Sequence, residues 1–158
     1  MTGTYAKTTT VPVEKSKAEI ERILTRYGAD QFMNGWDRER AVLGFIMRGR
    51  QVRFVLPLPM RDERQFTHYR HSSGMTKVRT ESAATEQWEQ ACRQRWRALV
   101  LIVKAKLEAV EAGITSFEDE FLANIVLPDG GRVGDWLQPQ IEQAYLTNQM
   151  PKLLGAGS

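Results

Sequence analysis

Residues 40–57 read RAVLGFIMRGRQVRFVLP, and this stretch decides the fold of the chain. In its second half Val52, Phe54 and Leu56 alternate with other side chains, which is the period of a strand with one buried face. Its first half is apolar on both faces, as expected of a central strand. Gly49, between the halves, can take the positive φ that a tight turn requires. The stretch therefore predicts an antiparallel hairpin that ends at the following proline.

A third strand is predicted before this hairpin, over residues 31–36. Phe32, Asn34 and Trp36 alternate there with side chains of the other face. Asp37 and Arg38 then supply a turn into the next strand. The three strands follow one another with short connections, so the sequence predicts a three-stranded antiparallel meander.

Helices are predicted on both sides of the meander. Ser16 and Glu19 form the S-x-x-E pattern of a capping box, and Gly28 is placed to end the helix, which predicts a helix over 16–27. A long helix over 82–112 is predicted by apolar residues at steps of mostly three and four. Its apolar stripe comprises Trp88, Cys92, Leu99, Val103, Leu107 and Val110.

Two shorter helices complete the expected fold. Thr115 and Glu118 repeat the capping pattern before a short amphipathic helix. Asp135 is the expected N-cap of a last helix over about 135–147. Its expected buried face comprises Trp136, Leu137, Ile141 and Tyr145. The fold class is therefore α+β: an N-terminal helix, a three-stranded antiparallel meander, a long amphipathic helix, then two shorter helices.

The expected domain organisation is a flexible N-terminus over 1–15, one α+β domain over 16–150 and a flexible tail over 151–158. Residues 60–80 show no periodicity and are polar, basic and interrupted by Ser-Ser-Gly. Loops of this length are uncommon in compact domains unless they are functional or disordered. We expect an exposed basic loop there.

Composition narrows the protein's class and compartment. Hydrophobic residues make up 42% of the chain and charged residues 26%, which is typical of a globular protein. No apolar run approaches the roughly 18 residues of a membrane span, and the N-terminus lacks the apolar core of a signal peptide. The single cysteine, Cys92, fits a reducing compartment. We therefore expect a cytoplasmic protein with no membrane partner.

Charge is distributed unevenly along the chain. Between Arg38 and Arg79 there are ten basic and three acidic residues, and between Glu108 and Glu142 there are eight acidic and one basic. Such an asymmetry favours a dipolar surface whose basic pole attracts polyanions. The alternative, that the two poles are simply solvated or pair with each other, remains open.

No catalytic or metal-binding constellation is present in the sequence. His68 and His71 are two ligands where a zinc site needs more, and Cys92 falls in an apolar helix stripe away from them. The glycines at 130, 131 and 134 match no nucleotide-binding fingerprint. We therefore expect no catalytic residues, no metal and no cofactor.

The basic residues are the better candidates for a functional surface. Phosphates are bound by several cations spread over nanometre distances, and arginine favours bidentate contacts. Phe66 and Tyr69 lie among these charges, where an aromatic ring can stack on an unpaired base. The candidate nucleic-acid-binding residues are Arg48, Arg50, Arg53, Arg61, Arg64, Phe66, Tyr69, Arg70, Lys77, Arg79, Arg93 and Arg97. The hairpin arginines at 48, 50 and 53 are expected to form the centre of this surface.

Three segments carry a resemblance: EIERILTRYGADQF, GFIMRGRQVRFVLPLP and WEQACRQRWRALVLIVKAKLEAVEAGITSFEDEFLANIVLPDG. They resemble an uncharacterised family of small proteins encoded by bacteriophages and prophages, over about Val11 to Met150. The resemblance implies a bacterial cytoplasm and a phage setting, and it transfers no catalytic residues.

The order helix, three strands, long helix is also similar to that of double-stranded RNA-binding domains. The lysine cluster that those domains carry at the start of their second helix is missing here, where Glu81, Glu86 and Glu89 stand. That function is therefore not carried across.

These observations lead to two main hypotheses. The first is a non-enzymatic nucleic-acid-binding protein of phage or prophage DNA metabolism, with DNA favoured. The alternative is a protein–protein modulator, an inhibitor or adaptor of a host or phage factor; an enzyme with an unfamiliar site is a third, weaker reading. A homo-oligomer that covers excess apolar surface between Trp88 and Trp96 is also compatible with the sequence.

Overall fold

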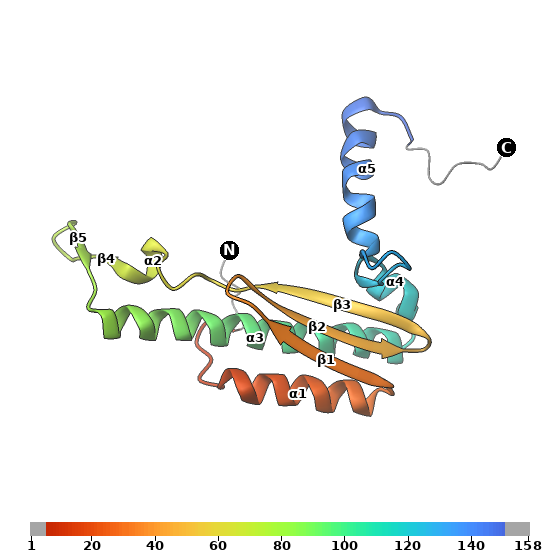
Figure 1. The fold of residues 1–158 in the computed structure, drawn as a ribbon, viewed down its shortest axis with the longest axis horizontal. Coiled ribbons are helices and arrows are strands. Elements are labelled where there is room, and N and C mark those ends of the chain that lie inside the picture. The colour runs from red at the N-terminus through yellow and green to blue at the C-terminus, as the bar shows by residue number, and fades with distance from the viewer. Residues whose placement is uncertain (1–5, 151–158) are drawn as a thin grey trace.

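The computed structural model describes residues 6–150 of the chain. Their order is helix, three strands, a small inserted unit, a long helix and three short helical elements (Figure 1). The elements are α1 (Val13–Arg26), β1 (Gln31–Trp36), β2 (Arg40–Met47), β3 (Arg50–Pro57), α2 (Arg64–Thr67), β4 (His68–Arg70), β5 (Thr76–Val78), α3 (Glu81–Glu111), α4 (Phe117–Phe121), η1 (Leu122–Asn124) and α5 (Val133–Thr147). The α+β class predicted from the sequence is confirmed.

The main sheet has the strand order β1-β2-β3, with both pairs antiparallel. Arg48 and Gly49 connect β2 to β3 and have φ values of 52° and 71°. Positive φ at both central residues is the geometry of the two-residue turn that matches strand twist. The predicted meander and its turn are confirmed, and so is the central position of β2.

The core lies between one face of this sheet and the helices α1 and α3. Side chains of β2 alternate between buried and half-buried, and Ala41, Leu43, Phe45 and Met47 are the buried ones. The opposite face of β2, which the sequence also indicated to be apolar, is half-buried. Phe121 of α4 closes the end of the core, with its ring centroid 5.8 Å from that of Phe45.

Several helix starts differ from their predicted positions. α1 begins at Val13 after Pro12, so Ser16 lies within the helix, is fully buried and caps nothing. Thr80 caps α3 and Ser116 caps α4, each by accepting from a backbone N–H three residues on. The expected capping by Thr115 is therefore wrong by one residue. The expected N-cap role of Asp135 is also wrong, since α5 begins at Val133.

Contacts between the N-terminal segment and the rest of the fold begin nearer the start of the chain than expected. Ala6 is buried, and the side-chain amide of Gln90 on α3 donates to the carbonyl oxygen of Thr9 over 2.8 Å. The expected flexible segment over 1–15 is therefore too long, because residues 6–12 lie against α3 and α1 has begun by residue 13. The expectations for 1–5 and 151–158 lie outside the described residues.

Residues 60–80 are not the structureless loop that the sequence predicted. They form one helical turn, α2, followed by a two-stranded antiparallel hairpin, β4–β5. Figure 1 shows this unit beside the N-terminal end of α3, at the far end of the molecule from the β2–β3 turn. The elements are too short to produce a periodic pattern in the sequence.

The last helix, α5, projects away from the body (Figure 1). The prediction that its apolar side chains are buried is wrong for three of the four residues: Trp136 and Ile141 are exposed, Tyr145 is 87% exposed, and Leu137 is half-buried. Its contact with the body is at its base, where Gly134 lies so close to Ala123 that an added Cβ would be 2.9 Å from the carbonyl oxygen. No helix within residues 6–150 is both long and apolar enough to span a membrane.

Candidate nucleic-acid interface

The structure separates the predicted basic set into three places. Arg48, Arg50 and Arg53 lie at or near the β2–β3 turn, and Arg93 and Arg97 lie on α3. The remaining predicted residues lie between 61 and 79, on or next to α2 and the β4–β5 hairpin. We call residues 61–79 the basic arm. Because the turn and the arm lie at opposite ends of the molecule (Figure 1), they do not form one continuous surface.

The arginines near the turn are partly engaged by neighbouring elements. The Arg48 guanidinium lies 5.7 Å from the Phe117 ring centroid, next to the acidic first turn of α4. Arg50 is exposed. Arg53 is half-buried, and its carbonyl oxygen accepts from the side-chain amide of Asn124 over 3.2 Å. Acidic residues at this end offset part of its positive charge.

The two predicted arginines of α3 form ion-pair and hydrogen-bond contacts within the fold. Arg97 forms an ion pair with Glu19 of α1, so its charge holds the two helices together. Arg93 donates from Nε and Nη2 to the Gln90 side-chain oxygen, over 2.9 and 2.6 Å. Both are half-buried, so neither has the free geometry expected of a phosphate contact.

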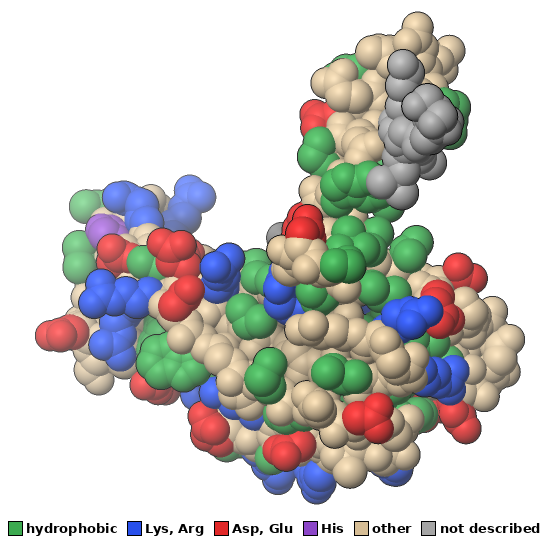
Figure 2. Space-filling view, turned by 45° about the vertical axis from the view of Figure 1, so that its right-hand side comes forward, with side chains coloured by type: hydrophobic (Ala, Val, Ile, Leu, Met, Phe, Trp, Pro, Cys, Tyr) green, Lys and Arg blue, Asp and Glu red, His purple; other side chains and the backbone are tan. Residues whose placement is uncertain are grey.

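The basic arm has the most accessible cations of the predicted set. Arg61, Arg64, Arg70 and Lys77 are all exposed, and no carboxylate in the described part of the chain forms an ion pair with them. In the hairpin register Tyr69 faces Lys77, so an aromatic ring and a cation share one face of the ribbon. Figure 2 shows Lys, Arg and His side chains together on this projecting lobe, above a group of acidic ones.

Two predicted residues of the arm have structural roles. Arg79 donates from Nη1 to the carbonyl oxygens of Gln65, Phe66 and His68, over 3.0, 3.0 and 2.8 Å, and thereby fixes the end of α2. Its guanidinium also lies 5.6 Å from the Tyr69 ring centroid. Phe66 is only 5% exposed, so the expectation that it stacks on a base is wrong.

The two histidines of the arm have local partners. His68 Nδ1 lies 2.7 Å from the Thr67 hydroxyl, and His71 Nδ1 lies 2.9 Å from the Ser73 hydroxyl. Among residues 6–150 no group of three or more His, Cys, Asp or Glu side chains is arranged to hold a metal ion.

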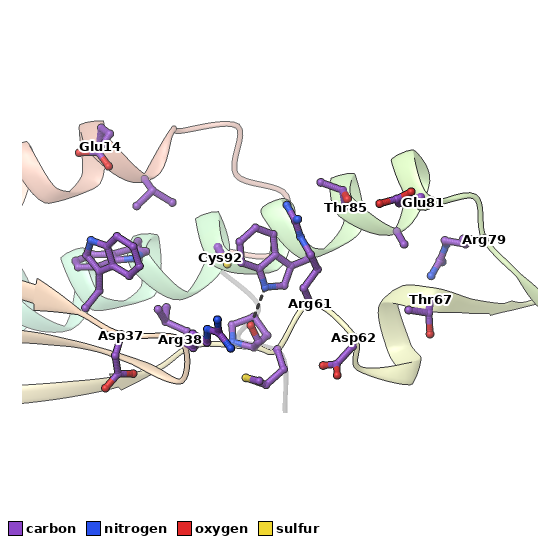
Figure 3. A pocket seen from close by; sticks show the side chains of 18 of the residues that line it. Glu14, Asp37, Arg38, Arg61, Asp62, Thr67, Arg79, Glu81, Thr85 and Cys92 are labelled. Carbon is purple, nitrogen blue, oxygen red and sulfur yellow. Dashed lines mark hydrogen bonds between the residues drawn. The ribbon is translucent and has the colours of Figure 1, made fainter.

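An apolar groove of 1120 Å³ adjoins the arm, and the sequence did not reveal it. It runs between α1, the β1–β2 turn, the segment after β3 and the N-terminal half of α3. Trp36, Trp88 and Trp96 line it, and Figure 3 shows Thr67 and Arg79 of the arm at one end and Asp37 at the other. We call it the tryptophan groove. The one sequence signal was the Trp88–Trp96 spacing, which indicated excess apolar surface on the long helix.

The rings of the groove are held in defined positions. Trp88 donates from its indole N–H to the carbonyl oxygen of Pro59 over 2.7 Å, drawn as the dashed line in Figure 3, and the Arg61 guanidinium lies 4.8 Å from its ring centroid. Lys17 lies 5.1 Å from the Trp96 ring centroid, and Trp96 itself is buried. Trp36 is 73% exposed, so most of its surface is available to a ligand.

Charges around the groove are partly neutralised. Glu14 pairs with Lys17 over 3.3 Å, and Asp37 pairs with Arg40 over 3.5 Å. Hydrogen bonds from the backbone N–H groups of Glu39 and Arg40 lower the pKa of Asp37, which keeps it ionised at neutral pH. Burial raises the pKa of the Cys92 thiol in the groove wall, which disfavours a nucleophilic role at neutral pH.

No protein-family model, no curated protein and no solved structure matches the chain. Function is therefore inferred from the geometry of the molecule.

Proposed function

We propose that the protein binds nucleic acid without catalysing a reaction, and that the basic arm is the principal contact. One observation carries the proposal: Arg61, Arg64, Arg70 and Lys77 are exposed on a projecting unit, with no ion-pair partner within residues 6–150. A cation that is already paired has little to gain from a phosphate, whereas an unpaired one releases counterions when it binds.

The shape of the arm supports this reading. A two-stranded antiparallel ribbon is narrow enough to enter the major groove of a duplex, and its side chains alternate between two faces. Arg70 and Lys77 lie on opposite faces of the ribbon, because Lys77 is paired with Tyr69 and Arg70 with Thr76. The ribbon can therefore contact phosphates on both of its sides.

The resemblance to phage-encoded proteins favours a role in phage or prophage DNA metabolism in the bacterial cytoplasm. DNA is the favoured polymer on the same ground. Because the preference for DNA is itself proposed, the binding experiment includes RNA.

Reversing two charges of the arm tests the proposal directly. Binding of labelled single- and double-stranded DNA and RNA is measured by fluorescence anisotropy over a range of salt concentrations. Four phosphate contacts predict a slope of log K against log salt of about −3 to −4. The double variant Arg70→Glu/Lys77→Glu is expected to lose at least about tenfold in affinity and to flatten the slope by about two.

The matched control is Arg48→Glu/Arg50→Glu, which makes the same charge change at the other end of the molecule. Apart from the general effect of the altered net charge, this control is expected to change the affinity by less than about threefold. No binding at low salt would exclude the proposal. A larger loss in the control than in the arm variant would instead return the centre of the interface to the β2–β3 turn.

A second candidate function is capture of a host or phage protein by α5. This helix exposes Trp136, Ile141, Tyr145 and Leu146, and only two of its side chains, Asp135 and Glu142, carry charge. Large apolar side chains that are exposed close together normally mark a contact surface. Figure 2 shows hydrophobic side chains at the surface of this projection. Co-purification from infected cells that survives nuclease treatment, and is lost in Ile141→Glu/Tyr145→Glu, would favour this candidate.

A further inference from the structure

We propose that the tryptophan groove binds unpaired nucleobases, so that the protein prefers single-stranded to double-stranded nucleic acid. This inference rests on the proposed function, because it assigns the polymer that reaches the groove from the basic arm. The arm contacts phosphates of any nucleic acid, and the groove selects for bases whose faces are free.

The groove offers aromatic ring surface to a ligand. Trp36 presents 73% of its surface, and Trp88 lies deeper in the same groove with its indole fixed by Pro59. Bases stack on aromatic side chains whatever their sequence, because every base has a π-face. A groove of 1120 Å³ exceeds the range of about 300–1,000 Å³ that holds a drug-sized ligand, so it has room for more than one base.

The groove is continuous with the basic arm. Arg61, Val78 and Arg79 belong to the arm and also line the groove (Figure 3). A strand whose phosphates lie along the arm therefore reaches the groove without crossing another surface. The Arg61 guanidinium over the Trp88 ring adds a cation beside a stacking surface, an arrangement found in single-strand binding sites.

The charges that line the groove are nearly balanced. Glu14 and Asp37 are each engaged by a cation, so they repel a phosphate less than free carboxylates would. The remaining charges that line the groove are those of three arginines, Arg38, Arg61 and Arg79, and two acids, Asp62 and Glu81. With the Glu14–Lys17 pair and Asp37 included, the lining holds four basic and four acidic side chains, so the groove is close to neutral. A neutral groove suits nucleobases, because the negative charge of a nucleotide chain lies on its phosphates and not on its bases.

Duplex DNA cannot use the groove in this way. Its bases stack on one another, and a base must leave the stack before its face is available to a side chain. Ring surface in a groove therefore contributes to the binding of single strands alone. A proline-rich peptide can also dock in an aromatic groove, but the arginines shared with the arm favour the nucleotide chain.

The test substitutes Trp36→Ala and measures three probes at one salt concentration. They are an oligothymidylate of about 12 nucleotides, an abasic phosphodiester of the same length, and a duplex of that length. Loss of stacking on one base is expected to weaken oligothymidylate binding roughly 5- to 150-fold. Affinity for the abasic strand and for the duplex is expected to stay unchanged. Trp36→Phe keeps a ring and is expected to recover most of the loss.

Trp136→Ala on α5 is the matched control, since it removes an exposed tryptophan outside the groove. It is expected to leave all three affinities unchanged. An unaltered oligothymidylate affinity in Trp36→Ala, with salt-dependent binding of all probes, would overturn the inference and leave the proposed function standing. An equal loss for all three probes would overturn it too, since that would assign Trp36 to phosphate binding or folding.

Absence of binding to every polymer at low salt would remove the proposed function and this inference together. Binding of a proline-rich peptide that Trp36→Ala abolishes, without any oligonucleotide binding, would make the groove a peptide site and overturn the inference.

Discussion

The hydroxyl group of Ser16 is fully buried in α1, and its oxygen has no hydrogen-bond partner among residues 6–150. A buried polar group without a partner loses its hydration and gains nothing in return. Ser16→Ala is therefore expected to raise the free energy of unfolding by about 1 kcal/mol, which corresponds to a Tm increase of about 2–4 °C for a chain of this size.

Thermal unfolding followed by circular dichroism checks this expectation. If Ser16 acted as an N-cap, the same substitution would instead cost about 1 kcal/mol, so the sign of the shift separates the two roles. Ser116→Ala is the matched control, because Ser116 does accept a hydrogen bond at a helix start. It is expected to lower the free energy of unfolding.

Helix caps are also where sequence reasoning at the residue scale was least accurate. The capping pattern identified the neighbourhood of each helix start, but the true cap at α4 is Ser116 and not Thr115. Which of two adjacent hydroxyls caps a helix depends on the backbone dihedrals of both residues, and these follow from packing. Arg48 shows the same limit: its positive φ comes from the turn that Gly49 and the strand twist impose.

Among the elements, those with a local period were predictable. The three strands and α3 were found to within one or two residues, because alternation and helical spacing are written into consecutive side chains. The basic arm was missed because its strands have three residues each. Its stability also comes from Arg79, whose carbonyl partners lie 11 to 14 residues earlier in the chain.

Removing that side chain tests how the arm is held. Arg79→Ala deletes three hydrogen bonds to carbonyl oxygens. Hydrogen bonds to charged groups contribute about 1.5–3 kcal/mol each when intact. Loss of even one of them is enough to make amide hydrogen exchange in residues 64–78 at least about tenfold faster, with α1 and α3 unaffected.

Arg64→Ala is the matched control, since it removes an exposed arginine of the same arm that braces nothing in the described residues. Its exchange pattern is expected to match that of the unmodified protein. Equal exchange rates in Arg79→Ala and Arg64→Ala would contradict the bracing role of Arg79.

For the whole molecule, the sequence located the basic segment but not its geometry. It could not show that Arg48 and Arg70 lie at opposite ends, because that separation depends on how α3 carries the arm away from the sheet (Figure 1). The tryptophan groove could not be predicted from the sequence for a similar reason. Its walls come from separate parts of the chain, and only their packing brings Trp36 and Trp88 into one groove.

The projection of α5 gives a prediction at this scale. Of the residues in α5, Gly134 is the buried one, so the helix contributes little apolar burial to the body. A chain that ends at Gly131 is expected to fold and to unfold within about 4 °C of the full chain, as judged by differential scanning calorimetry.

A chain that ends at Ile114 serves as the contrasting control. It lacks Phe117 and Phe121, whose fully buried rings close the core. Each large-to-small loss of this kind costs about 3–5 kcal/mol, so this shorter chain is expected not to fold. A large drop in Tm for the chain ending at Gly131 would mean that α5 supports the core.

The order of the elements also has a kinetic consequence. Every pairing in the main sheet joins consecutive strands through a short turn, so the loop-closure entropy of the meander is small. The contact between α1 and α3 joins two segments that are separated in sequence by the whole meander and the arm. Forming it therefore closes a long loop. We expect the meander to collapse early and α3 to dock after it. During synthesis, the part of the apolar sheet face that α3 covers therefore stays open to solvent until the ribosome has released that helix.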